Sequence, residues 1–227
     1  MVGVGVTANL LQEIAMKGLF GRLAAVVLAL GIVAAPLAAQ TFNPNYVGGD
    51  GMGVTVSGDF GYGVSDASGK DKYVGGRATI GVSMVVINAG AGYALDTKIA
   101  SFGGNVAANF LSLPGSPLKV GVYAGANYWS KSGINSLVVP AGALVTISPP
   151  SPSIGFDVWL APGIRYMRAS AGGVSASTTK FGGSAGVNVN MPAGFGFHAA
   201  LDYTNISGGS PMLIGGGIHY KFGMPGM

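Results

Sequence analysis

Residues 212–222 read MLIGGGIHYKF, and they end the patterned part of the chain with a strict alternation. Every second position from Met212 to Phe222 is apolar, aromatic or glycine, whereas the positions between them end in His219 and Lys221. Successive side chains of a β-strand point to opposite faces. The stretch therefore predicts a strand with one apolar, aromatic face and one small, polar face.

The same alternation recurs through most of the chain before this stretch. It predicts nine clear strands, at residues 52–62, 73–84, 87–95, 101–110, 118–129, 156–166, 180–191, 195–203 and 212–222. Turn-forming residues separate them, in SDASGKDK (65–72), LPGSP (113–117), ASAGGVSAS (169–177) and Pro192–Gly194. A further tight turn is expected at Val85–Val86.

Residues 136–148 are the least regular part of the pattern, because Pro140 interrupts an otherwise apolar run and cannot donate to a strand ladder. Including them gives ten strands. An even number brings both ends of the chain to the periplasmic side, with LPGSP, SPPSP (148–152) and MPAG (191–194) as periplasmic turns. Eight strands, without the first run, are the alternative.

Charged and histidine side chains within the predicted strands fall on the face opposite the long apolar residues. They include Asp59, Arg77, Lys119, Asp157, Arg165, Lys180, His198, Asp202, His219 and Lys221. Glycine, serine and asparagine fill much of the same face, which suits a narrow polar lumen, while the apolar face suits lipid. Because an open sheet edge in lipid leaves backbone groups unpaired, the sheet should close. We predict an all-β fold, a closed antiparallel transmembrane β-barrel; a secreted β-sandwich or soluble barrel is the alternative.

Aromatic residues mark the ends of the outward faces. Tyrosine favours the membrane–water interface because its ring is apolar and its tip is polar. The predicted girdle comprises Tyr62, Tyr93, Tyr128, Tyr166 and Tyr203 at the outer leaflet, with Tyr220 and Phe222 at the periplasmic side.

A terminal aromatic residue preceded by alternating apolar positions resembles the closing strand of bacterial outer-membrane β-barrels. The pattern from residue 52 to residue 222 is similar to the small outer-membrane barrel superfamily, of the OmpA-like transmembrane-domain and opacity-protein kind. The tail at 223–227 departs from it, since the family's last strand ends in Phe. The resemblance implies fold and location in the bacterial outer membrane, and implies little about activity.

The N-terminal region is predicted to be processed. Residues 1–15 are interpreted as an upstream start extension, and residues 16–39 have the basic, apolar and small-residue regions of a signal peptide, with cleavage after Ala39. An N-terminal membrane anchor is the alternative. Residues 40–51 would then form a lead-in to a barrel at 52–222.

Composition excludes several classes of function. The 227-residue chain has no cysteine, only 9% charged residues and a formal net charge of +4 without basic blocks. No thiolate metal site or thiol nucleophile is possible, and nucleic-acid binding, which usually needs a basic patch, is not expected. We expect no cofactor and no metal.

A polar cluster in the lumen is the one candidate site. It would contain Asp59, Arg77, Asp157, Arg165, His198, Asp202, His219 and Lys221. One interpretation is an acid–base site, which needs an activated nucleophile and an oriented base. The other is a hydrogen-bonded plug that satisfies buried charges.

We favour the plug, and so predict a structural or surface barrel that is not an enzyme. A narrow porin or small-molecule transporter is the second hypothesis, and a lipid-modifying enzyme or protease the third. Expected partners are outer-membrane lipids and lipopolysaccharide, and the barrel-assembly machinery through the C-terminal strand.

Overall fold

The structure, a computed structural model, describes residues 46–47, 53–112, 115–151, 153–206 and 209–222. The predicted upstream extension, signal peptide and cleavage site, most of the lead-in and the tail lie outside the described residues. The strands are β1 (Gly53–Gly63), β2 (Lys72–Val82), β3 (Val85–Ala94), β4 (Ile99–Ser112), β5 (Leu118–Lys131), β6 (Ile134–Ile147), β7 (Gly155–Ala171), β8 (Val174–Asn190), β9 (Phe195–Thr204) and β10 (Met212–Phe222). Single 3-10 turns form η2 (Asp66–Ser68) and η3 (Pro192–Gly194). Among the described residues, no helix is long and apolar enough to cross a membrane.

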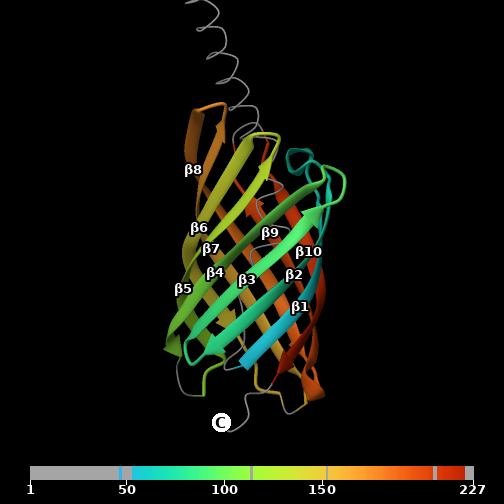
Figure 1. Cartoon of the computed structure of the whole chain (residues 1–227). Coiled ribbons are helices and arrows are strands. Elements are labelled where there is room, and N and C mark those ends of the chain that lie inside the picture. Colours follow the sequence, from blue (N-terminus) through green and yellow to red (C-terminus); the bar gives the residue numbers. More distant parts are fainter. Residues whose placement is uncertain (1–45, 48–52, 113–114, 152, 207–208, 223–227) are drawn as a thin grey trace, which may run out of the picture.

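Each strand pairs antiparallel with its neighbours in sequence, and β1 also pairs with β10, which closes the barrel (Figure 1). Val54 lies opposite Phe222 at one end of this seam, and Gly63 lies opposite Leu213 at the other. The prediction of ten strands is confirmed, and the eight-strand alternative is wrong because β1 is a full member of the sheet. We call the end where β1 begins and β10 ends the terminal rim, and the opposite end the far rim.

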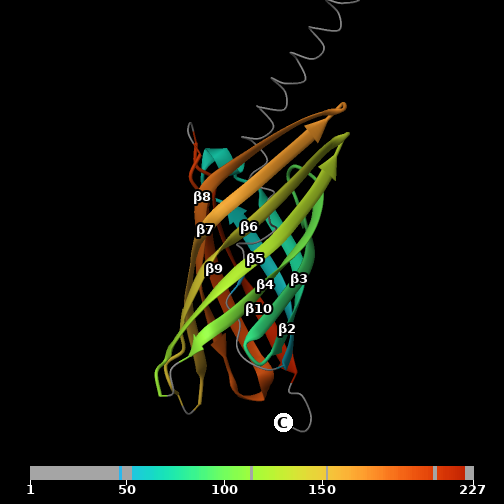
Figure 2. The same ribbon diagram turned by 90° about the vertical axis from the view of Figure 1, so that its left-hand side faces the viewer.

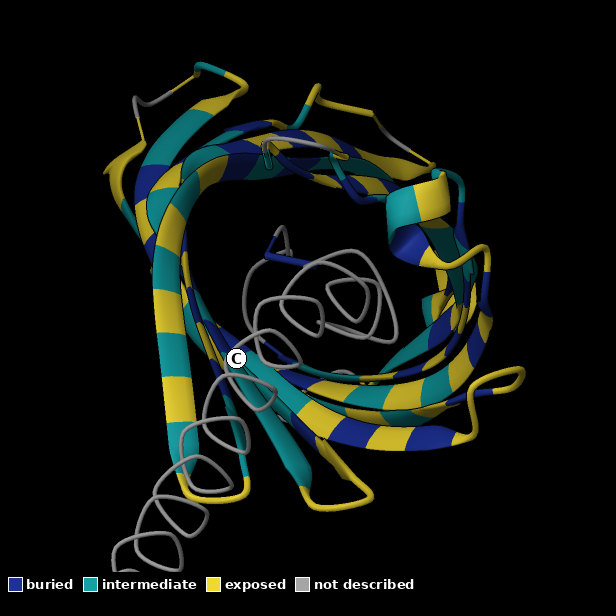
Figure 3. Cartoon of the chain, turned by 90° about the horizontal axis from the view of Figure 1, so that it is seen from above, coloured by how far each residue is buried: buried dark blue, intermediate teal, exposed yellow. Residues whose placement is uncertain are grey.

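Exposure alternates along the strands, as Figure 3 shows by its bands of colour. On β10, for example, Ile218 is 63% exposed and the adjacent His219 is 7% exposed. Large apolar residues therefore cover the outside and polar residues face the lumen. This arrangement is the reverse of a soluble barrel and is the one that lipid requires.

Glycines on the inner face make room for large lumenal side chains. A Cβ atom on Gly186 would lie 2.5 Å from Trp159 Cζ2, and one on Gly182 would lie 2.7 Å from Arg165 Nε. Both distances are below van der Waals contact. The high glycine content thus follows from packing inside a narrow barrel.

Pro140 lies within β6 at a point where the ladder to β5 is interrupted. Pairing between β5 and β6 passes from Ala124–Ala141 to Asn127–Val138 and keeps the same register. Pro140 has no N–H to donate, and β6 keeps its place in the sheet because Pro140 still lies opposite Arg165 of β7. The uncertain tenth strand is confirmed, with bounds Ile134–Ile147.

The turn between β2 and β3 lies at Ser83–Met84 and not at Val85–Val86, as the sequence had indicated. Val85 pairs with Val82 and Val86 pairs with Gly81, so both valines belong to the ladder. Ser83 adopts a φ of 53°, which allows the two-residue turn.

The predicted polar loop at 169–177 is also wrong, because most of it is strand. β7 continues to Ala171 and β8 starts at Val174, with only Gly172 and Gly173 between them. Their φ values of 56° and 81° suit a tight hairpin turn. β8 pairs with β9 only over Gly182–Asn190, so the β7–β8 hairpin projects past the far rim (Figure 2).

Candidate functional site

The first group of lumenal polar residues joins β1, β2 and β9. His198 Nε2 lies 2.7 Å from Asp59 Oδ1, and Arg77 Nε lies 3.4 Å from Asp59 Oδ2. The side chains of Asp59 and His198 are only 2% and 1% exposed. Gly217 of β10 pairs with both residues and has no side chain to separate them. The carboxylate and the imidazole therefore meet across an intervening strand.

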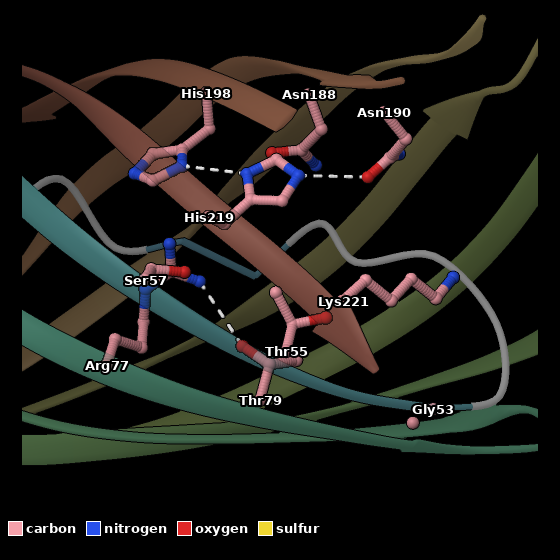
Figure 4. Close-up of a pocket in the computed structure, with 11 residues that line it drawn as sticks. Gly53, Thr55, Ser57, Arg77, Thr79, Asn188, Asn190, His198, His219 and Lys221 are labelled. Atoms are coloured by element: carbon pink, nitrogen blue, oxygen red, sulfur yellow. Dashed lines mark hydrogen bonds between the residues drawn. The ribbon is translucent and has the colours of Figure 1, made fainter. Parts of the chain in front are cut away.

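His219 extends this group toward β8. Its Nδ1 lies 3.2 Å from His198 Nδ1, and its Nε2 lies 2.9 Å from Asn190 Oδ1; Figure 4 shows these three side chains in a row. With Asn190 Oδ1 as acceptor, His219 donates from Nε2 and accepts at Nδ1. His198 contacts His219 through Nδ1 and the Asp59 carboxylate through Nε2. All four ring nitrogens have partners, so neither imidazole presents a free base to a nucleophile.

Hydrogen bonds continue from Arg77 in the other direction around the wall. Arg77 donates to Thr79 Oγ1 at 3.4 Å, Thr79 donates to Asn88 Oδ1 at 2.5 Å, and Asn88 donates to Asn105 Oδ1 at 2.9 Å. The chain of contacts thus reaches β4. Buried polar groups are costly when unpaired, and here each member satisfies the next.

The second group joins β7, β8 and β9. Arg165 donates to Asp202 Oδ2 at 2.7 Å and to Ser184 Oγ at 3.2 Å, and Ser184 donates to the same carboxylate oxygen at 2.7 Å. The side chains of Arg165 and Asp202 are 2% and 6% exposed. This is a desolvated ion pair, separate from the histidine pair.

Of the two remaining predicted residues, Asp157 lies apart from both groups and Lys221 lies beside the first. Asp157 accepts a hydrogen bond from Ser148 at the end of β6. Lys221 lines a cavity of about 40 Å³ together with Arg77, His198 and His219 (Figure 4). The structure therefore divides the predicted cluster of eight into several groups.

Tyr46 and Val47 form part of the lumen although the sequence analysis treated them as lead-in. They are 3% and 0% exposed and pack against inward-facing apolar residues, including Trp159. Sequence offered only a weak signal, two apolar residues set between asparagine and glycine.

The predicted girdle tyrosines lie on the outward face toward the far rim. Tyr93, Tyr166 and Tyr203 are 37–40% exposed, and Tyr62 and Tyr128 are half-buried. The Tyr128 hydroxyl donates to Asn135 and the Tyr203 hydroxyl to Ser210. At the terminal rim, the rings of Tyr220 and Phe222 meet edge to face, with centroids 4.7 Å apart.

At the far rim, the Asp71 carboxylate joins the start of β2 to the turn between β3 and β4. Asp71, 1% exposed, accepts hydrogen bonds from the backbone N–H groups of Lys72, Asp96 and Thr97 and from the Thr97 hydroxyl. Burial favours the neutral acid, but these hydrogen bonds outweigh it, above all that from the Thr97 hydroxyl. They hold the pKa of Asp71 below its ordinary value.

Comparison with known proteins agrees with this architecture. The family described as outer membrane protein beta-barrel domain matches residues 24–222. The chain belongs to this family. Membership makes it a transmembrane outer-membrane β-barrel and indicates a bacterial outer membrane as its location. Among curated proteins no significant match is found.

The chain also matches solved outer-membrane barrels at low sequence identity. The N-terminal barrel domain of Pseudomonas aeruginosa OprF is 10% identical, with 76% of this chain and 100% of that chain covered and a TM-score of 0.36. Ail of Yersinia pestis, in a nanodisc, is 15% identical, with coverage of 75% and 99% and a TM-score of 0.38. The translocator domain of NalP from Neisseria meningitidis is 13% identical, with coverage of 89% and 98% and a TM-score of 0.36.

Proposed function

We propose that this outer-membrane barrel has a structural role in the cell envelope and that its lumen is closed. The observation that carries the proposal is the burial of paired charges inside the barrel. Arg165 and Asp202 are almost fully excluded from solvent, as are Asp59 and His198. A water-filled channel would leave such groups hydrated, so their burial supports a filled lumen.

A narrow pore is the second candidate, favoured by one observation. The cavity at the terminal rim is lined by donors, among them Arg77, Lys221 and Thr55. Its volume of about 40 Å³ gives room for a few water molecules. Such a vestibule would have to continue past the histidine pair to conduct.

The geometry gives little support to an enzyme. A hydrolytic site needs a nucleophile hydrogen-bonded to a base that a third group orients. Asp59 orients His198, but the far nitrogen of that ring faces His219 and not a hydroxyl. We therefore propose that the pair is structural.

The proposed partners follow from the surface. Exposed apolar side chains such as Phe102, Phe181 and Ile218, each 58–63% exposed, are suited to lipid acyl chains. Above the girdle, Arg168 on the outward face of β7 is suited to the phosphates of lipopolysaccharide. We also propose that β10 is the strand recognised by the barrel-assembly machinery.

Single-channel recording tests the closed lumen. Protein purified from outer membranes should migrate as a heat-modifiable band on gels and give no steady conductance in planar bilayers. Stable, ohmic channels from the folded band would refute the closed barrel and favour the pore.

A further inference from the structure

Two residues that belong to no strand lie inside the barrel. Tyr46 and Val47 precede β1, and they pack with Ala107, Tyr123, Leu144, Trp159, Ala161 and Ala200. These neighbours come from β4, β5, β6, β7 and β9. Residues outside the ladder thus bridge most of the wall.

The wall contacts both the main chain and the side chain of Tyr46. Asn105 Nδ2 donates to the Tyr46 carbonyl oxygen at 3.1 Å. The Arg77 guanidinium carbon lies 4.3 Å from the centre of the Tyr46 ring, and the His198 ring meets it edge-on at 4.8 Å. Cation–π and edge-to-face contacts of this kind favour an aromatic ring at this position.

The contacts select the ring and not its hydroxyl. Tyr46 Oη is buried and has no hydrogen-bond partner among the described residues. The neighbouring position is fully buried in an apolar environment and takes the branched side chain of Val47. The site therefore has the features of a peptide-binding site: a donor for one carbonyl, an aromatic pocket and an aliphatic pocket.

The strands do not need these two residues for their own pairing. The closed ladder runs from Gly53 to Phe222, and Tyr46 and Val47 contribute no bond to it. Removing their side chains would therefore leave the barrel hydrogen bonds in place and vacate a site in the lumen.

We propose that Tyr46–Val47 is a tethered ligand that occupies a lumenal site for an aromatic–aliphatic peptide and keeps the lumen closed. The proposal rests on the proposed closed lumen and names the segment that closes it. An equivalent peptide supplied in solution should then replace the tethered one.

The first experiment compares three forms of the protein purified from outer membranes. Wild type and Tyr46→Phe should be silent in planar bilayers, because the phenyl ring keeps every contact. The double variant Tyr46→Ser/Val47→Ser should conduct, and the peptide NPNYVGG (residues 43–49) should block it, whereas a scrambled peptide should not.

The outcomes separate the two proposals. Conducting wild type would refute the closed lumen. Silent wild type with a folded, silent double variant would refute the tethered ligand alone, as would a conducting double variant that the peptide does not block.

A second measurement decides the matter if the double variant does not fold. The chain has no cysteine, so Val47→Cys introduces a unique thiol. We expect a maleimide reagent to label it roughly tenfold or more slowly in native membranes than after heat unfolding. Equal labelling rates in the two states would overturn the proposal.

Discussion

The Arg165–Asp202 ion pair gives a direct test of whether the lumen is filled. The two side chains are 2% and 6% exposed, and the nitrogen and oxygen atoms are 2.7 Å apart. Replacing Arg165 by alanine removes the cation paired with this buried carboxylate, to which the Ser184 hydroxyl still donates. Loss of one partner of a desolvated pair typically costs about 3–5 kcal/mol.

The chain offers a matched control three residues away on the same strand. Arg168 faces outward and is exposed, so Arg168→Ala should change the free energy of unfolding by less than about 1 kcal/mol. Urea unfolding from lipid vesicles, followed by tryptophan fluorescence, measures both variants. Arg165→Ala/Asp202→Ala should cost less than the two single variants together, since it removes both charges.

An aqueous lumen would give a different result. Hydrated ion pairs contribute about 0–1 kcal/mol and weaken as salt screens them. If Arg165→Ala costs no more than Arg168→Ala, or if its cost falls steeply with added salt, the filled lumen is refuted.

Three further predictions test the outside, the far rim and the packing. Ile218→Arg should lower the free energy of unfolding by roughly 2–4 kcal/mol if this surface faces lipid, and Met84→Arg at the turn by about 0–1 kcal/mol. Urea unfolding from vesicles measures both, and equal costs would contradict the lipid-facing assignment. Asp71→Ala should cost about 1–3 kcal/mol at pH 7. Because folding lowers the pKa of this carboxyl, its stabilisation is present above about pH 4 and is lost as pH falls through the folded value, so the variant should approach wild type in acid. Gly186→Ala should destabilise by about 1–3 kcal/mol, because Trp159 is 1% exposed and cannot yield; an unchanged unfolding midpoint would argue against a packed interior.

The outward surface and the strand number could be predicted from sequence because they depend on local alternation. A period of two decides which face each residue occupies, whatever its neighbours are. Even the segment that contains Pro140 could be predicted as a strand, because the number of strands had to be even. The structure adds that pairing with β5 is interrupted beside Pro140 and resumes in the same register.

The predictions of two connections were wrong because of the residue types found there. Serine, alanine and glycine at 169–177 have low strand propensity, yet pairing along β7 holds them in the ladder. Ser83–Met84 contains no glycine, so the turn gave no local signal. In both places, cross-strand hydrogen bonding overrides the preference of the individual residues.

The sequence predicted which side chains face the lumen, but not which of them bond to one another. Asp202 and His198 lie on the same strand and the same face, yet one bonds Arg165 and the other Asp59. Which residues meet depends on strand tilt and on gaps left by glycine. The alternation of apolar and polar residues predicts neither. The alternation could not place Tyr46 either, because that residue lies in no strand.

The Asp59–His198 contact also explains why a polar interior is compatible with a structural role. β10 is the strand that closes the barrel, and the contact joins the strands on either side of it, over Gly217. If β10 shifted by one residue in register, Ile218 would turn inward and His219 outward. The space over Gly217 and the His219 imidazole would both be lost from the lumen. The network can therefore form fully only in the closed, correctly registered barrel. Buried polar groups that are satisfied in a single register penalise the others, so the lumenal network stabilises one closed state of the barrel.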